Sequence, residues 1–367
     1  SAQQALTHVI DDINFYDIVF TDLNMPEMDG MEFIRKLGEL NFTGAVVIIS
    51  EMDHKVINLA ANLARHSNIH LVANLAKPVQ LSQVKTVLQK AKHLAVHNDL
   101  SHASISEKAL HEAINLNEII PYYQPKINSQ TSEIESIEVL ARIVKTHTGE
   151  IISPNRFISL SEQSGLINQI TFSLFEQATS DLKAIRTNIA AHLKLAFNLS
   201  PTQLDDLSCP NKLMLILQLN GLSPSDIILE ITEQHALSSL SQLETLNRLR
   251  MHGFGISLDD FGVGFTNMNQ IKRLPFTEIK IDRTLISNIE TDQFSQVVVS
   301  SLVDIASQEQ LALVAEGVER AEESLYLKNY RTNLAMQGFL FTCPKAKDDF
   351  IEWALNWVNT TGGTIKR

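Results

Sequence analysis

The sequence has few cysteines, few basic residues and no long hydrophobic run. Its two cysteines, Cys209 and Cys343, are too few for a disulfide framework and indicate a reducing compartment. The 30 Lys and Arg residues against 42 Asp and Glu give a net charge of −12, which argues against binding a nucleic-acid polymer through charge. No apolar stretch approaches the roughly 18 residues of a membrane helix, and no signal-peptide pattern opens the chain. We therefore expect a cytoplasmic protein with no membrane and no nucleic-acid polymer among its partners.

The chain divides into three parts that differ in composition. Hydrophobic residues make up 44% and charged residues 20%, which are ordinary globular values and exclude a long disordered chain. A length of 367 residues favours two or three domains. Residues 1–98 and 117–362 alternate apolar runs with helical patterns, whereas residues 99–116 begin polar and serine-rich and end in a short amphipathic helix. We predict two α/β domains, 1–98 and 117–362, joined by a linker and a connecting helix.

The first part predicts an α/β layer with buried parallel strands. Apolar runs at residues 17–22, 45–50 and 69–73 are separated by helical segments such as residues 31–40. Short apolar runs of this kind are typical of strands that are covered on both faces of a parallel sheet. The fold expected here is a partial doubly wound sheet.

The second part predicts a barrel. Its strand candidates are the eight apolar runs at residues 122–127, 136–143, 194–198, 227–232, 255–259, 278–282, 312–315 and 334–341. Helical segments lie between most of them, for example at residues 157–185, 239–252, 294–308 and 321–329. Eight strands that alternate with helices over about 250 residues are the pattern of a (β/α)8 barrel. The alternative is an open doubly wound sheet, but no glycine-rich dinucleotide turn follows an early strand.

Polar residues interrupt several of the predicted barrel strands. Side chains two positions apart share a face of a strand, so Glu138 and Arg142 face one way and Val139 the other. Glu230 and Lys280 likewise stand opposite apolar neighbours on their own strands, as does Asn198 on a third. The apolar faces should meet the outer helices. The polar side chains should then point into the barrel, close to the carboxyl ends of the strands where barrel active sites are found.

Two further acidic pairs follow later strands. Asp259 and Asp260 are adjacent, so both reach one site only if the chain turns between them, and Gly262 and the next glycine would permit a turn. Glu316 and Glu319 follow an apolar strand and lie on either side of a glycine.

The charge of these side chains predicts divalent cations. The carboxylates that would converge are Glu138, Glu230, Asp259, Asp260, Glu316 and Glu319. With Lys280 and Arg142 as the only evident cations, the charges sum to about −4, and two like charges 4 Å apart repel by about 4 kcal/mol at an effective dielectric near 20. Either several carboxylates are protonated or divalent cations lie among them. Oxygen ligands without Cys or His favour Mg²⁺ or Mn²⁺, and two such ions can activate a water and stabilise the leaving oxygen of a phosphodiester.

Taken singly, the same residues have plainer interpretations. A lone Asp or Glu at a strand end is most often a solvated loop residue or a helix cap, and Lys280 alone would be half of an ion pair with Asp282. The joint pattern over five strands favours a site. In that site Lys280 would orient the water or neutralise charge on the phosphoryl oxygens.

These motifs together resemble the EAL-domain phosphodiesterases. The matching runs are Tyr123-Gln-Pro-Lys126, Glu138-Val-Leu-Ala-Arg142, Phe197-Asn-Leu-Ser200, Leu229-Glu-Ile-Thr-Glu233, Asp259-Asp-Phe-Gly262, Ile279-Lys-Ile-Asp-Arg283, Ala315-Glu-Gly-Val-Glu319 and Gln337-Gly-Phe339. The eight motifs occur in the order of the family, and together they are highly specific. The resemblance implies a modified (β/α)8 barrel that hydrolyses cyclic di-GMP to linear pGpG. It also implies Mg²⁺ or Mn²⁺ as cofactor, with two ions in each active site.

The resemblance implies a role for each matched position. The metal ligands would be Glu138, Asn198, Glu230, Asp259, Asp260 and Glu316. The catalytic residues would be Lys280 beside the nucleophilic water, Gln337, Glu319, and Glu316 as second-metal ligand or general base. The nucleotide would contact Gln124, Leu140 and Arg142. Glu233 would anchor the loop after Asp260, which the family uses to link dimerisation to catalysis.

Two departures from the EAL pattern concern side chains near the site. The name-giving Glu-Ala-Leu is Glu-Val-Leu here, and because Val139 faces away from the site we expect little effect. The loop that follows Asp260 carries Val263, Thr266 and Asn267, where the family has small residues and a serine pair. We expect these residues to affect the ordering of the loop and the contact in a homodimer or higher homo-oligomer.

The first part resembles the receiver domain of response regulators. The run Asp17–Gly30 places Asp22 at a strand end as the phosphoacceptor. Ser50 would be the switch hydroxyl and Lys77 the lysine that pairs with the phosphoryl group. This resemblance implies a sensor histidine kinase as partner and two-component control of the barrel.

The family's opening strand, with its acidic pair for Mg²⁺, is absent from the sequence. Asp11 and Asp12 come at the end of a helix just before the phosphoacceptor strand and are poor substitutes. The first strand, the first helix and the second strand of the receiver are therefore expected to be missing. Either the sequence is a fragment of a longer chain, or the receiver is degenerate and is not phosphorylated.

Two other functions stay open beside the phosphodiesterase. A non-catalytic cyclic di-GMP receptor would bind the dinucleotide without hydrolysing it, although such proteins usually lose a metal ligand and every ligand position is occupied here. A protein–protein module that signals through the receiver face alone would have no affinity for the dinucleotide.

Overall fold

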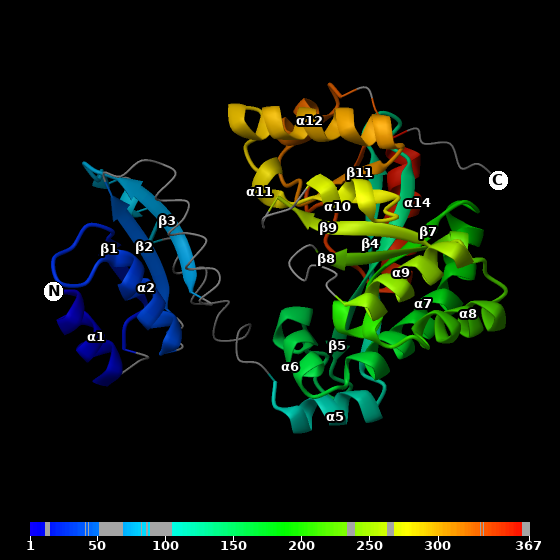
Figure 1. Cartoon of the computed structure of the whole chain (residues 1–367), viewed down its shortest axis with the longest axis horizontal. Helices are drawn as coiled ribbons and strands as arrows, with labels where there is room; N and C mark the ends of the chain where they lie inside the picture. The colour runs from blue at the N-terminus through cyan, green and yellow to red at the C-terminus, as the bar shows by residue number, and fades with distance from the viewer. Residues whose placement is uncertain are drawn as a thin grey trace. The chain divides into compact units, whose positions relative to one another are not determined.

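The computed structural model divides the chain into two compact units, Ser1–Ala103 and Ser104–Arg367 (Figure 1). The residues that it describes are 1–11, 15–40, 42, 44–50, 69–81, 83–85, 87–88, 105–232, 239–262, 268–330, 332 and 334–361. None of the described helices combines the length and the apolar composition that crossing a membrane requires.

The described part of the first unit contains three parallel strands in sequential order. They are β1 (Ile18–Asp22), β2 (Ala45–Ser50) and β3 (His70–Ala76), with β2 in the middle. Helix α1 (Ala2–Asp11) precedes the sheet, and α2 (Gly30–Glu39) begins after Asp29, whose side chain accepts a hydrogen bond from the Glu32 amide. The predicted α/β layer with parallel strands is confirmed, but only the central strand β2 is buried along most of its length, whereas β1 is largely half-buried.

The second unit is built on a closed ring of eight strands. They are β4 (Ile119–Asn128), β5 (Ile134–Val144), β7 (Lys194–Asn198), β8 (Ile227–Thr232), β9 (Gly255–Phe261), β10 (Glu278–Ile281), β11 (Ala312–Ala315) and β12 (Leu334–Met336). The ring closes because β4 pairs with both β12 and β5, and both pairings are antiparallel whereas the other pairings in the ring are parallel. A short strand, β6 (Ile151–Ile152), pairs with β5 outside the ring. The modified (β/α)8 barrel is confirmed, and the open sheet is excluded.

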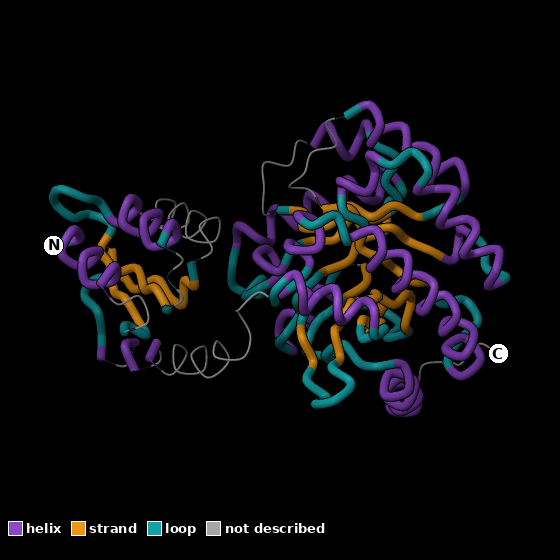
Figure 2. Tube along the Cα trace, turned by 90° about the horizontal axis from the view of Figure 1, so that it is seen from below, coloured by secondary structure: helices purple, strands orange, loops and turns teal. Residues whose placement is uncertain are grey.

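Helices surround the barrel strands (Figure 2). They are α5 (Glu107–Asn115), α6 (Ile158–Gln163), α7 (Ile167–Asn188), α8 (Cys209–Asn220), α9 (Leu240–His252), α10 (Met268–Arg273), α11 (Arg283–Ile286), α12 (Gln293–Glu309), α13 (Ala321–Leu327) and α14 (Lys347–Thr361). Three 3₁₀ turns, η1 (Pro154–Arg156), η2 (Pro201–Asp205) and η3 (Pro224–Asp226), lie in the connections.

Most predicted elements agree with the structure to within a few residues, and two differ more. The helix predicted over residues 157–185 is two helices, α6 and α7, because the chain passes through Gly165 at a φ of +74°. The strand predicted over residues 334–341 ends at Met336. Gly338 lies so close to the Val318 backbone that a Cβ atom would come 2.1 Å from the Val318 carbonyl oxygen, and the chain turns there.

The core of the second unit lies between the barrel and its helices. The apolar faces of the strands point outward, as in the contact of Phe197 on β7 with Phe175 on α7, whose ring centroids are 4.7 Å apart. Glu138, Glu230 and Lys280 are also buried, but they lie on the opposite faces of their strands, inside the ring. The barrel therefore packs an apolar shell around a polar interior.

Candidate active site

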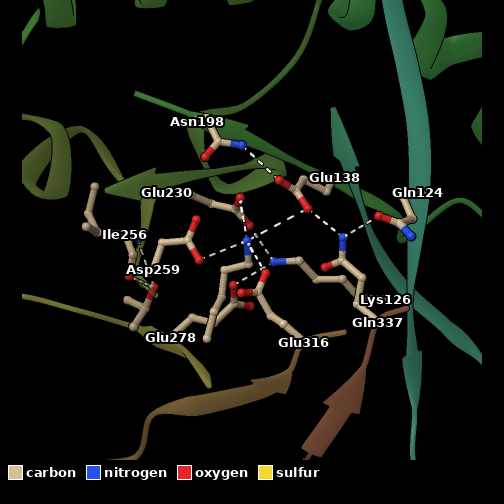
Figure 3. Close-up of polar contacts among 12 residues, drawn as sticks. Gln124, Lys126, Glu138, Asn198, Glu230, Ile256, Asp259, Glu278, Glu316 and Gln337 are labelled. Carbon is tan, nitrogen blue, oxygen red and sulfur yellow. Dashed lines mark hydrogen bonds and ion pairs between the residues drawn. The ribbon is translucent and has the colours of Figure 1, made fainter. Parts of the chain in front are cut away.

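The strand register places the predicted polar residues at the carboxyl end of the barrel. Asn198 on β7 lies opposite Glu230 on β8, and Thr232 at the end of β8 lies opposite Asp259 on β9. Glu138 extends from β5 toward the same point (Figure 3). Because neighbouring parallel strands end at one edge of the sheet, residues far apart in the sequence come together there.

A β-bulge brings Asp259 and Asp260 to the same side. Leu258 pairs with Ile279 of β10, but the next pair is Phe261 with Ile281. Two residues of β9, Asp259 and Asp260, therefore lie opposite one residue of β10, Lys280. Asp260 itself has a φ of +59°, and its amide donates to Asp259 Oδ1 at 2.9 Å. From the sequence we expected the turn at Gly262 and the next glycine. The structure instead shows that it begins at Asp260, a residue type that tolerates positive φ better than most.

The ammonium group of Lys280 lies at the centre of the carboxylates. Its Nζ is 2.7 Å from Glu316 Oε1, 3.0 Å from Glu230 Oε2 and 3.1 Å from Asp259 Oδ1. The Glu138 carboxylate is farther away, at 3.8 Å. The contact with Glu230 Oε2 is a hydrogen bond, and those with Glu316 and Asp259 are ion pairs. Asp282 is not the partner of Lys280, because its side chain caps α11 by accepting from the Thr284 amide.

A second buried lysine was missed in the sequence. Lys126 on β4 is fully buried, and its Nζ lies 2.7 Å from Glu230 Oε1 and 2.8 Å from Glu278 Oε1. The prediction that Lys280 and Arg142 are the only cations is therefore wrong. The signal was available, because Lys126 stands two residues after Gln124, a predicted site residue, and so shares its face of the strand.

Arg142 forms no ion pair with the carboxylates among the described residues. Its guanidinium donates to the Ala141 carbonyl at 2.7 Å and lies over the Tyr122 ring, 5.7 Å from the centroid. Burial lowers the pKa of Arg142 from its ordinary value. The cation that balances the cluster beside Lys280 is thus Lys126, not Arg142.

The two lysines and the burial of the site separate the pKa values of its carboxyl groups. Burial alone would raise the pKa of Glu230, but the charges of Lys126 and Lys280 outweigh it and lower this pKa to about 2. Burial and the charge of Glu230 raise the pKa of Glu138 to about 7. Burial also raises the pKa of Glu316 well above its ordinary value, against the opposing charge of Lys280.

Amide side chains fix the orientation of Glu138. Asn198 Nδ2 donates to Glu138 Oε1 at 2.8 Å, and Gln337 Nε2 donates to Glu138 Oε2 at 2.5 Å. Gln337 Nε2 also contacts Gln124 Oε1 at 3.0 Å, and Gln124 Nε2 donates to the Thr342 carbonyl at 3.0 Å. Both oxygens of Glu138 are therefore held by neutral donors. Gln337 Oε1 is buried and has no hydrogen-bond partner among the described residues.

The donor set fits a divalent cation. One side-chain oxygen from each of Asp259, Asp260 and Glu316 lies within 4.8 Å of the others. These donors are all carboxylate oxygens, which suit Mg²⁺ or Mn²⁺. Glu319, predicted to join them, is instead paired with Arg283, with Arg283 Nη2 2.5 Å from Glu319 Oε2.

Two cavities open at this end of the barrel. One of about 280 Å³ is lined by residues that include Gln124, Leu140, Glu316, Glu319 and Gln337. A larger one of about 520 Å³ extends from Glu138, Asn198 and Glu230 along α6 and α7. Two of the three residues predicted to contact the nucleotide, Gln124 and Leu140, thus line a cavity beside the carboxylates.

The predicted residues of the first unit also meet at the carboxyl ends of their strands. Asp22 ends β1, Ser50 ends β2, and Lys77 follows β3. The Lys77 ammonium lies 2.5 Å from Asp22 Oδ2, and this hydrogen bond lowers the pKa of Asp22 from its ordinary value.

Several predicted residues lie outside the described part of the chain. They are Glu233, the loop residues Val263, Thr266 and Asn267, and Asp12 beside the receiver strand. Their predicted roles stay predictions.

Comparisons with known proteins agree with this geometry. Residues 107–344 match the EAL domain family, and residues 1–89 match the response regulator receiver domain. The cyclic di-GMP phosphodiesterase RocR of Pseudomonas aeruginosa is 29% identical over 349 residues, which cover 94% of this chain and 88% of that protein. The probable cyclic di-GMP phosphodiesterase PdeG of Escherichia coli is 33% identical over 252 residues. The match covers 68% of this chain and 49% of PdeG, so this chain spans about half of the length of that protein.

Solved structures show the same barrel. The PaMucR phosphodiesterase in complex with cyclic di-GMP is 31% identical with a TM-score of 0.61, and the match covers 66% of this chain and 98% of that one. The EAL enzyme Bd1971, bound to cAMP and cyclic di-GMP, is 26% identical with a TM-score of 0.63, covering 83% of this chain and 76% of that one. The chain belongs to the EAL-domain family, and a response regulator receiver domain precedes the EAL domain in its sequence.

Proposed function

We propose that the protein hydrolyses cyclic di-GMP to linear pGpG with the help of Mg²⁺ or Mn²⁺. The observation that carries this proposal is the set of carboxylates around the Lys280 ammonium at the carboxyl end of the barrel. The names of RocR, PdeG and PaMucR, which describe phosphodiesterases of the same family, support the substrate.

The side chains divide the work of such a reaction. The residues that would hold two divalent cations are Glu138, Asn198, Glu230, Asp259, Asp260 and Glu316. When bound, these ions would activate a water and stabilise the leaving oxygen of the phosphodiester. Lys280 holds three of the carboxylates by direct contacts and supplies positive charge where the phosphoryl oxygens would lie.

Glu316 is suited to accept a proton. Burial raises the pKa of its carboxyl group, so the carboxylate is a stronger base than an exposed glutamate. Gln337 holds Glu138 and lines the cavity, while Gln124, Leu140 and Arg142 would contact the nucleotide. Glu319 would act through its pairing with Arg283 on the same cavity wall.

The receiver would control the barrel. In this proposal residues 1–98 form the receiver, 99–116 the connection and 117–362 the phosphodiesterase, all in the cytoplasm. A sensor histidine kinase would phosphorylate Asp22, with Ser50 and Lys77 responding to the phosphoryl group. Control would act through a homodimer or higher homo-oligomer. Glu233 would anchor the loop that couples oligomerisation to catalysis. Sedimentation that showed a monomer at every concentration would exclude this form of control.

Product analysis tests the phosphodiesterase. Purified protein with Mg²⁺ or Mn²⁺ should convert cyclic di-GMP to pGpG, and EDTA should stop the reaction. Glu138→Ala should lower the rate at least about 100-fold, since even the outer-shell partners of metal ligands are worth 10- to 100-fold. The matched control is Glu322→Ala, which removes an exposed carboxylate on α13 and should leave the rate unchanged. Intact binding without turnover under either metal would contradict the enzyme and favour the receptor function.

A further inference from the structure

An alternating line of charges runs through the interior of the barrel. Glu278 stands at the amino end of β10, two residues before Lys280 on the same face of the strand. Between them in space lie Lys126 and Glu230, which give the order Glu278, Lys126, Glu230, Lys280 (Figure 3). The line connects the amino end of the barrel with the predicted metal site.

Each oxygen of Glu230 is held by a different lysine. Oε1 accepts from Lys126 at 2.7 Å and Oε2 accepts from Lys280 at 3.0 Å. The side chains of Glu230 and Lys126 are both 0% exposed. Lys280 also contacts Asp259 and is part of the cluster at the carboxyl end, so Oε2 is the oxygen that faces the site. Oε1 is directed toward the interior.

Glu278 in turn holds Lys126 from the other side. Its Oε1 lies 2.8 Å from the Lys126 ammonium, and the Glu278 side chain is only 8% exposed. Without Glu278 the flexible lysine stem would be free to follow the negative charge of the site. With Glu278 present, the ammonium is balanced between two carboxylates.

We infer that Lys126, anchored by Glu278, is a positioning residue. It holds Oε1 of Glu230 toward the barrel interior, so that only Oε2 faces the metal site. This inference rests on the proposed metal-dependent function. A purely stabilising role is the weaker explanation, because a buried ion pair is often replaced by apolar residues of similar volume without loss of stability. What an apolar replacement does not supply is the fixed orientation of the Glu230 carboxylate.

A double substitution tests the inference without leaving an unpaired buried charge. Lys126→Met combined with Glu278→Gln removes the ammonium and the charge that it balances. In calorimetry the dissociation constant for Mn²⁺ should increase 10- to 100-fold, as it does when partners of metal ligands are changed in other proteins. The hydrolysis assay should show a lower kcat with an unchanged KM for the dinucleotide. Glu278→Gln alone weakens the anchor of Lys126 but keeps the ammonium beside Glu230, so its Mn²⁺ affinity should fall less than that of the double variant.

Arg186→Met is the matched control for lost stability. Arg186 pairs with Asp226 at 2.6 Å, before the amino end of β8 and outside the cavities at the site. It should lower the melting temperature while leaving the Mn²⁺ affinity intact.

Three results would decide the question. Weaker Mn²⁺ binding in the double variant supports the inference. Unchanged binding with a lower melting temperature would show a role in stability only, and tighter binding would show that Lys126 acts only by repelling cations; either would overturn it. Failure of the unsubstituted protein to hydrolyse cyclic di-GMP, with its Mn²⁺ affinity intact, would overturn the proposed function alone.

Discussion

The buried carboxyl group of Glu138 predicts a pH dependence for the stability of the metal-free barrel. Burial and the neighbouring Glu230 charge raise the pKa of Glu138 from its ordinary 4.5 to about 7 in the folded protein. The folded state therefore holds this proton more tightly than the unfolded state does. The resulting stability is fully present below pH 4.5 and is lost as the pH rises through 7. In EDTA, the barrel should unfold more easily at pH 8 than at pH 5.

The magnitude follows from the two pKa values. Each pH unit between them changes the free energy of unfolding by about 1.4 kcal/mol, so the loss from pH 5 to pH 8 is about 3 kcal/mol. The raised pKa of Glu316 acts in the same direction. Glu230 does not oppose this change, because its pKa is lowered to about 2 and its contribution is lost only as the pH falls from 4.5 through that value.

Urea unfolding at pH 5 and pH 8 measures the effect. The chain has two tryptophans, Trp353 and Trp357, and both lie on α14, so their fluorescence reports the barrel unit. Glu138→Gln should reduce the difference between the two pH values. Mn²⁺ should also reduce it, because metal ligands bind as carboxylates. Equal or greater stability at pH 8 in EDTA would refute the reasoning.

Two further predictions concern the fold and the receiver. Gly338→Ala should lower the free energy of unfolding by more than about 2 kcal/mol in the same urea assay, because the new Cβ would lie 2.1 Å from the Val318 carbonyl oxygen. Gly149→Ala is its control and should cost only about 1 kcal/mol, since Gly149 has a positive φ but nothing within 4 Å of an added Cβ. A small-molecule phosphoryl donor should change the hydrolysis rate of the unsubstituted protein but not of Asp22→Asn. An equal response in both would exclude control through Asp22.

Much of the site follows from strand alternation. Glu138, Glu230 and Lys280 each lie inside the ring while their apolar neighbours lie outside, as the period of two in their strands predicts. Parallel strands that share one carboxyl edge bring such residues together whatever their separation in the sequence. Alternation therefore predicts a site even where no single residue is informative.

Strand alternation did not predict the bulge at Asp259 and Asp260 or the partners of Lys126. A bulge changes the count of residues on one strand relative to its neighbour, and nothing in the run Asp259–Gly262 shows that Asp260 itself takes the positive φ. The partners of Lys126 lie 104 and 152 residues away on β8 and β10. Their pairing depends on β4 running antiparallel to both neighbours, a property of the closed ring and not of the local sequence.

The buried lysines change the argument from charge. A ring of acidic side chains without metal was expected to be too repulsive to persist, yet in the structure two ammonium groups lie among the carboxylates and Glu138 and Glu316 have raised pKa values. Protonation and internal lysines thus offset the repulsion in the metal-free protein. Since metal ligands must be deprotonated, the proposed cations would compete with the protons of those carboxyl groups. Because burial raises the pKa of Glu138 to about 7, cation affinity at this site should depend on pH near neutrality.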